Sequence, residues 1–161
     1  MGKGKEFKVI QPPTEIPVKE EVLYKNRVFL AGSIEMGIAE EWQSNVISMF
    51  NETKNTLIYN PRRDDWDSSW EQKIENDQFR EQVEWELEKL EKANWIVMYF
   101  SPGTISPISL LELGIHSNGS KLLVCCPEGY QRKGNVDIVC KRYGIQQFET
   151  LEEIVNYIKG N

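Results

Sequence analysis

A single acidic residue stands out in the stretch SPGTISPISLLELG, residues 101–114. Glu112 has small and aliphatic neighbours, and the stretch follows an apolar run at residues 95–100 that is typical of a buried strand. A carboxylate on a helix that begins just after such a strand can act as a nucleophile or stabilise a developing cation. The alternative is an exposed helix acid, which is the more common role of a single Glu.

A second set of acids lies on the helix that the apolar spacing predicts at residues 77–93. Its glutamates include Glu84, Glu86, Glu88 and Glu91. Charged residues on such a helix usually form its solvated face, and each of these residues has that alternative. Trp85 directly precedes Glu86, which indicates that this edge of the helix is not fully exposed to solvent.

The strand expected at residues 27–32 ends in AGSIEMG, which has groups that can bind an anion. Backbone N–H groups around Gly32 and the hydroxyl of Ser33 are suitable donors at the start of a following helix. The stretch matches neither a dinucleotide-binding nor a P-loop motif, because the glycine and lysine positions differ. An ordinary strand-to-helix turn is therefore the alternative.

The polar loop at residues 62–77 is long for a connection without structure of its own, and such loops are often functional. Its two arginines, Arg62 and Arg63, can grip a phosphate. Asp64, Asp65 and Asp67 can accept hydrogen bonds from base amino groups, and Trp66 or Trp70 can stack on a ring. The alternative is a solvated loop with internal Arg–Asp pairs.

Composition disfavours long nucleic acid and a membrane as partners and is compatible with a small-molecule substrate. The chain has 161 residues, enough for one domain with a real core, and its net charge of −6 disfavours long nucleic acid. No apolar run approaches the ~20 residues that span a bilayer, and the basic N-terminus lacks the apolar segment of a signal peptide. Three cysteines without CxxC spacing read as reduced thiols, so we expect a cytoplasmic protein. With His116 as the only histidine, we expect no metal and no other cofactor.

Strands and helices alternate along the chain, which predicts an α/β fold with a parallel sheet covered on both faces. We expect strands at residues 27–32, 55–61, 94–100, 120–127 and 145–148, and helices at residues 38–52, 77–93, 107–119, 135–144 and 150–159. Residues 1–26 are expected to form an N-terminal arm or extension, and residues 27–161 the domain. Because ligands of such sheets bind outside the carboxyl ends of the strands, the loops that follow the strands should converge on one pocket.

Five stretches within residues 27–148 together resemble the nucleoside 2-deoxyribosyltransferase-like superfamily, near its deoxynucleoside 5′-monophosphate N-glycosidases. They are VFLAGSIEMG, NPRRDDWDSSW, FREQVEWELEKLEKANWIVMYF, SPGTISPISLLELG and VCCPEGYQRKGNVDIVCKRYGI. The resemblance implies a flavodoxin-like, doubly wound sheet of about five parallel strands with helices on both faces. It also implies cleavage of the N-glycosidic bond of a 2′-deoxynucleoside or its 5′-monophosphate through a deoxyribosyl-Glu intermediate, with transfer to another base or to water.

The resemblance also assigns roles to the acids. The family nucleophile is the Glu of an ELG motif, here Glu112. The family also has an acid eight residues before the end of the helix that leads into the strand at residues 94–100. Counted back from Asn94, this acid falls on Glu86, and the resemblance implies that it protonates the departing base. The aromatic residue near the end of the first strand falls on Phe29, which has no hydroxyl to donate to Glu112.

Further positions bear on the substrate and on assembly. Six residues before the nucleophile, the transferases carry an Asp that binds the free 5′-hydroxyl and the monophosphate hydrolases carry a Ser; this chain has Ser106. The GSI sequence with Ser33 also resembles the hydrolases, so the resemblance favours a phosphorylated substrate. Asp65 falls near the base-contacting position of the polar loop. Asn135 falls on a position that reaches the 5′ end in a neighbouring subunit, which implies a homo-oligomer, a dimer or larger.

Two alternatives from other classes stay open at this point. The same fold can sense a nucleotide without turnover, an alternative that the departures from the family pattern at Phe29 and Asn94 favour. A glycohydrolase that acts on a ribonucleotide such as NAD is the other alternative.

Overall fold

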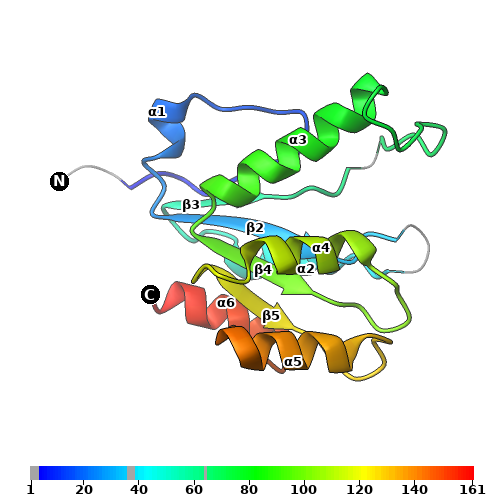
Figure 1. Ribbon diagram of the computed structural model, residues 1–161. Coiled ribbons are helices and arrows are strands. Elements are labelled where there is room, and N and C mark those ends of the chain that lie inside the picture. Colours follow the sequence, from blue (N-terminus) through cyan, green and yellow to red (C-terminus); the bar gives the residue numbers. More distant parts are fainter. Residues whose placement is uncertain (1–3, 36–38, 64) are drawn as a thin grey trace.

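The computed structural model describes residues 4–35, 39–63 and 65–161. Within this part of the chain, six parallel strands form one sheet in the order β1-β3-β2-β4-β5-β6. The strands are β1 (Lys8–Ile10), β2 (Asn26–Gly32), β3 (Thr56–Tyr59), β4 (Trp95–Tyr99), β5 (Leu122–Cys125) and β6 (Gln146–Phe148). The helices are α1 (Val18–Glu21), α2 (Trp42–Phe50), α3 (Asp77–Lys92), α4 (Pro107–His116), α5 (Lys133–Tyr143) and α6 (Leu151–Lys159). The fold is α/β and flavodoxin-like, as the sequence predicts (Figure 1).

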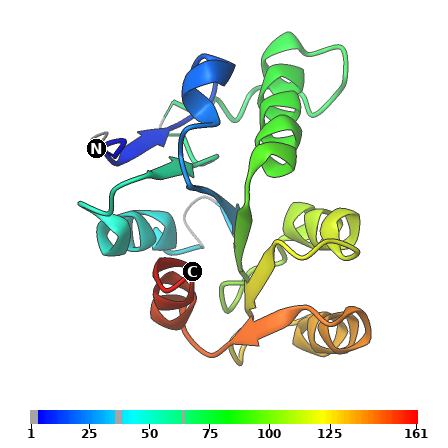
Figure 2. The same cartoon turned by 90° about the vertical axis from the view of Figure 1, so that its left-hand side faces the viewer.

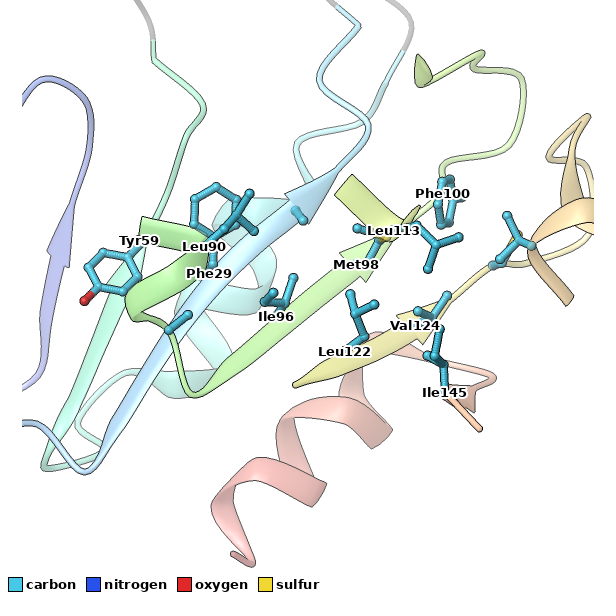
Figure 3. Close-up of a cluster of buried hydrophobic side chains, with 14 of the residues drawn as sticks. Phe29, Tyr59, Leu90, Ile96, Met98, Phe100, Leu113, Leu122, Val124 and Ile145 are labelled. Atoms are coloured by element: carbon cyan, nitrogen blue, oxygen red, sulfur yellow. The ribbon is translucent and has the colours of Figure 1, made fainter. Parts of the chain in front are cut away.

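Helices cover both faces of the sheet, and the alternation of side chains along each strand decides which helices a residue meets. Val28 and Leu30 of β2 pack in one buried cluster with residues of α2 and α6, whereas Phe29 belongs to the opposite cluster with residues of α3, α4 and α5. Figure 2 shows α2 (cyan) and α6 (red) on one side of the sheet and α3 to α5 (green to orange) on the other. In Figure 3, Leu90 of α3 and Leu113 of α4 lie over this second face with Phe29. The helices that carry the two candidate acids therefore share one face.

The carboxyl end of β2 requires a glycine. Gly32 has a φ of 136°, in the region that other residues rarely adopt. A Cβ at this position would collide with the backbone carbonyl oxygen of Tyr99, its neighbour on β4. The N–H of Ser33 donates to the same carbonyl oxygen at 3.0 Å. The chain can thus leave β2 close against β4 and deliver the next residues to the edge of the sheet where the site lies.

The amino-terminal segment differs most from the sequence prediction. The sequence predicts an arm or extension at residues 1–26 and about five strands, but residues 8–10 form a sixth strand that pairs with β3 at the edge of the sheet. The helix predicted at residues 38–52 is also shorter: it spans Trp42–Phe50, and residue 38 lies outside the described residues. Residues 8–10 of the predicted extension therefore belong to the sheet.

The segment that follows β1 packs against α3. The indole Nε1 of Trp85 donates to the carbonyl oxygen of Thr14 at 2.9 Å. Lys89 is fully buried, and its ammonium group lies 2.5 Å from Glu15 and 3.9 Å from the buried carboxylate of Glu21. These contacts fix the position of α3, which forms one wall of the site described below.

We expect Lys89→Met to lower the free energy of unfolding by about 2 kcal/mol, because it removes the charged hydrogen bond to Glu15 and one of the two cations beside the buried carboxylate of Glu21, which keeps Lys92 at 3.3 Å. Urea unfolding at neutral pH measures the change. The matched control is Lys73→Met, since Lys73 is 65% exposed and pairs with an exposed glutamate, and it should change the free energy by less than about 0.5 kcal/mol. Equal effects of the two substitutions would contradict the structural role of Lys89.

Candidate active site

A cavity of about 350 Å³ lies on the α3–α4 face of the sheet, next to the carboxyl end of β2. Its walls are mostly aliphatic and aromatic, as in many small-molecule sites. Phe29 contributes from β2, Leu90 from α3 and Ile115 from α4. Among the described residues that line the cavity, the charged ones are Glu35, Arg63, Glu86 and Glu112. These few polar groups must orient any ligand that enters.

Glu112 projects from α4 into this cavity. The helix begins with Pro107, and it turns the polar side chains of Ser109 and Glu112 inward, where both are buried. Leu111 and Ile115 line the cavity as well but remain more than half exposed at its rim. The alternative of an exposed helix acid therefore does not hold for Glu112.

Glu86 enters the same cavity from α3, where it is half-buried. The amide nitrogen of Gln82 donates to Glu86 Oε1 at 2.9 Å and to the carbonyl oxygen of Pro61 at 3.2 Å. The amide oxygen of Gln82 accepts from Arg63 at 3.3 Å. Gln82 thereby fixes the orientation of the Glu86 carboxyl, and it distinguishes Glu86 from the other glutamates of this helix.

The two carboxyl groups hold protons more tightly than ordinary glutamates do. Burial raises the pKa of Glu86 from 4.5 to about 7, although the hydrogen bond from Gln82 opposes the shift. Burial and, second, the charge of Glu86 raise the pKa of Glu112 to about 8. Near neutral pH the pair therefore retains a proton, and one carboxylic acid and one carboxylate can coexist there. This is the state in which one acid can donate a proton while the other acts as a nucleophile.

These raised pKa values also predict a pH dependence of stability. Between the ordinary pKa of 4.5 and the raised values near 7 and 8, the folded protein binds more protons than the unfolded chain, so its stability falls as pH rises through this range. Relative to the double variant Glu86→Gln/Glu112→Gln, we expect the wild type to lose at least about 2 kcal/mol between pH 5 and pH 8. Urea unfolding at several pH values measures the difference. The burial of the pair would be contradicted if the free energy of unfolding of the wild type changed with pH as that of the double variant does. It would also be contradicted if the exposed control Glu128→Gln showed the pH profile of the double variant.

Phe29 of β2 lies at the floor of the cavity. Its side chain is 1% exposed, lines the cavity and packs at 6.4 Å between ring centroids against Trp85. Gly32 lines the cavity at the end of the same strand. Because Phe29 has no hydroxyl, its contribution to the site is apolar surface rather than a hydrogen bond to Glu112.

Ser33 and Ser106 meet although 73 residues separate them along the chain. Their hydroxyl oxygens are 2.6 Å apart, and Thr104 completes a buried cluster of hydroxyls at 3.0 Å from Ser33 and 2.8 Å from Ser106. Ser106 lines the cavity, whereas Ser33 is fully buried behind it and is not a lining residue. The structure brings the two predicted serines together, but it directs their hydroxyls toward each other.

The polar loop closes another side of the cavity. Trp66 lines it and packs edge-on against Trp70 at 4.9 Å between ring centroids. Asp65 is exposed and accepts two hydrogen bonds from Arg63, at 2.7 Å and 2.9 Å. The pKa of Asp65 is lowered, mainly by this bond to the guanidinium. Asp64 lies outside the described residues.

The remaining prediction concerns Asn135, which lies apart from the cavity. Asn135 is exposed in the first turn of α5 and is not among the described residues that line the cavity. Sequence reasoning missed four polar residues that do line it, Glu35, Gln72, Gln82 and Ser109. Gln82 had a usable signal, because it lies four residues before Glu86 and therefore one helical turn away on the same face.

The fold and the cavity define an α/β protein that places two carboxyl groups of raised pKa in one mostly apolar pocket. The family profile described as nucleoside 2-deoxyribosyltransferase like matches residues 25–130, a span that contains both Glu86 and Glu112 but ends before Asn135. This chain belongs to the nucleoside 2-deoxyribosyltransferase-like family. Membership suggests a glycosyl-transfer enzyme with small-molecule nucleoside substrates.

No curated protein matches the chain. Over the described residues, no cluster of three or more His, Cys, Asp or Glu side chains is arranged to hold a metal ion. None of the helices within the described ranges combines the length and apolar character needed to cross a membrane.

Proposed function

We propose that this protein cleaves the N-glycosidic bond of a 2′-deoxynucleoside or its 5′-monophosphate and passes the deoxyribosyl group to another base or to water. Glu112 is the proposed nucleophile and Glu86 the proposed general acid and base. The observation that carries the proposal is the meeting of these two acids, from α3 and α4, in one cavity on one face of the sheet. Their raised pKa values support a pair that keeps one shared proton near neutral pH.

In the first step, a carboxylate oxygen of Glu112 forms a bond to C1′ as the bond between C1′ and the base nitrogen breaks. The electron pair of the broken bond goes to the base, which takes the proton of Glu86. Positive charge develops on the sugar in the transition state. This charge favours the ionised form of Glu112, which leaves the shared proton on Glu86.

In the second step, water or a second base attacks C1′ and Glu86 removes its proton. The ester bond between C1′ and Glu112 breaks, and its electron pair restores the Glu112 carboxylate. Gln82 supports both steps because its amide holds the carboxyl of Glu86 in a fixed orientation. No metal or other cofactor is needed for this sequence of bond changes.

The other proposed contacts are to the base and the sugar. Trp66, in the polar loop, is the proposed stacking surface for the base, with Asp64 and Asp65 as its polar partners. Asp65 can accept from the base while it keeps its two contacts with Arg63, because a carboxylate has about four acceptor sites. Phe29 and Gly32 form the surface under the sugar, and Ser33 and Ser106 lie toward its 5′ end.

We also propose that the protein assembles as a homo-oligomer, with Asn135 reaching a neighbouring subunit's substrate. An apolar stripe supports this: Ile108, Leu111 and Ile115 of α4 are each more than half exposed, at the rim of the cavity. Contiguous exposed apolar residues often mark a protein interface. Sedimentation that detects only monomer would remove the role of Asn135.

We also propose that the protein is located in the cytoplasm. All three cysteines, Cys125, Cys126 and Cys140, are free and buried. Burial raises the pKa of each thiol, which suits inert structural thiols in a reducing compartment.

Chromatography of the released bases tests the proposed function. Purified protein is mixed with the four 2′-deoxynucleosides, their 5′-monophosphates and NAD, each with and without added free adenine. Base release without an acceptor indicates a hydrolase, and exchange only with adenine indicates a transferase; either result supports the proposal. Release from NAD alone, or binding of a nucleotide without turnover, would contradict it in favour of a glycohydrolase or a sensing module.

A further inference from the structure

The end of the cavity beside the start of α4 is occupied by a side chain of the protein itself. Glu35 Oε1 accepts hydrogen bonds from the backbone N–H groups of Ile105, at 2.8 Å, and Ser106, at 2.6 Å. Ser106 has a left-handed backbone, with φ 48° and ψ 54°. Successive N–H groups around such a residue form a concavity that binds anions. The carboxylate of Glu35 therefore fills the place that phosphate oxygens would take.

The buried hydroxyls beside this place have no proton left to donate. Thr104 donates its proton to the carbonyl oxygen of Ser101 at 2.8 Å, and Ser33 Oγ accepts from the N–H of Ser101 at 2.9 Å. Only the protons of Ser33 and Ser106 then remain for the three contacts that join the hydroxyls, so the cluster has no spare donor. Since each hydroxyl has only one proton, a phosphate could gain a donor here only by breaking the cluster.

The charges around the cavity also disfavour a phosphate. Arg63 is the only cation among the described residues that line it, and its guanidinium is held by Asp65. Glu35, Glu86 and Glu112 are acids on the same cavity. A phosphate would add about two negative charges next to Glu35 without a free cation to balance them.

The 5′ end of a bound substrate should lie close to Glu35. Ser106 precedes Glu112 by six residues, which is about 9 Å along the axis of α4. The proposed function places C1′ at Glu112 and the base toward Glu86, which leaves the end of the cavity beside Ser106 for the far end of the sugar. A 5′-hydroxyl there can donate its proton to the carboxylate of Glu35, whereas an ionised phosphate has no such proton to give.

We propose that Glu35 makes this pocket select a 2′-deoxynucleoside over its 5′-monophosphate. This inference rests on the proposed function and narrows its substrate class. It reverses the expectation from the sequence, where Ser33 and Ser106 favour a phosphorylated substrate, because the hydroxyls of both serines are engaged with each other and with Thr104.

The test compares kcat/KM for deoxynucleosides and their 5′-monophosphates in the wild type and in two variants. Glu35→Gln keeps an acceptor for the N–H groups of Ile105 and Ser106 but removes the charge, and Glu35→Ala frees both groups. We expect the wild type to prefer the nucleoside at least 100-fold, Glu35→Gln to reduce this preference at least 10-fold, and Glu35→Ala to reduce it further. The matched control is Glu41→Gln, an exposed acid a few residues along the chain that does not line the cavity and should keep the wild-type preference.

Calorimetric titration of the same proteins with a deoxynucleoside and its monophosphate separates this inference from the proposed function. Efficient wild-type cleavage of the monophosphate, or an unchanged preference in both Glu35 variants, would overturn the inference and leave the proposed function intact. If the wild type cleaves neither substrate, the proposed function fails, and the dissociation constants decide the role of Glu35. The inference is then supported if the wild type binds the monophosphate more weakly than the deoxynucleoside and Glu35→Gln reduces this difference. Equal binding of the two ligands, or binding of neither, would overturn the inference.

Discussion

Replacing Glu112 by Gln is expected to lower kcat/KM for base release by on the order of 10⁴-fold or more. Glutamine has nearly the same shape, so the apolar packing of α4 is retained, but its amide cannot form the glycosyl ester. Initial rates of base release, followed by chromatography, measure the loss. The large effect follows from the proposed role of Glu112 in bond formation rather than in substrate binding alone.

Glu128→Gln is the control for this variant, because Glu128 is an exposed acid outside the cavity. It should keep the wild-type rate. The Glu112→Gln protein should also be at least as stable as the wild type at pH 8, since a buried carboxyl with a pKa of about 8 is replaced by a neutral group. Base release by Glu112→Gln within ten-fold of the wild-type rate would remove Glu112 from the mechanism.

Glu86→Gln gives the second large effect, an expected loss in kcat/KM on the order of 10²- to 10³-fold. The loss should be smaller for nucleosides whose bases leave without protonation, because these need no general acid. In the wild type, activity should fall as pH rises through about 8, where the pair loses its remaining proton, and the variant should lack this limb. Rates for a series of leaving bases across pH 5 to 9 measure both properties.

The matched control for Glu86→Gln lies on the same helix. Glu84 is 69% exposed and faces Arg80 at 4.0 Å, so Glu84→Gln should preserve both the rate and the pH profile. A loss that is equal for all leaving bases, with the alkaline limb retained, would indicate that Glu86 only shapes the pocket.

The sequence predicts the architecture well because the strands carry a local signal. The central strands are continuous apolar runs followed by helices of clear periodicity, and the structure places them within a few residues of the predicted bounds. The edge strand β1 lacks such a signal. It is three residues long, lies between lysines and two prolines, and is defined only by its pairing with β3 about 49 residues later.

The site could be predicted only in part. Glu112 is distinctive in sequence because it is the only acid in an apolar stretch, but Glu86 is one of several similar glutamates until the resemblance selects it. What makes Glu86 different is contact between distant segments, since Gln82 also binds Pro61 and Arg63 of the polar loop. The position of Glu35 depends likewise on residues 70 and 71 positions away, and no local pattern records such contacts.

Peptide mapping of a trapped intermediate tests the central claim most directly. A nucleoside of 2′-deoxy-2′-fluoroarabinose should slow both steps, because fluorine destabilises the positive charge that develops on the sugar. After rapid acid quench, digestion and mass spectrometry, the account predicts one sugar adduct, on the peptide that contains Glu112, and its absence from Glu112→Gln. Release of the base with Glu112 unmodified, or an adduct on another residue, would contradict the proposed nucleophile.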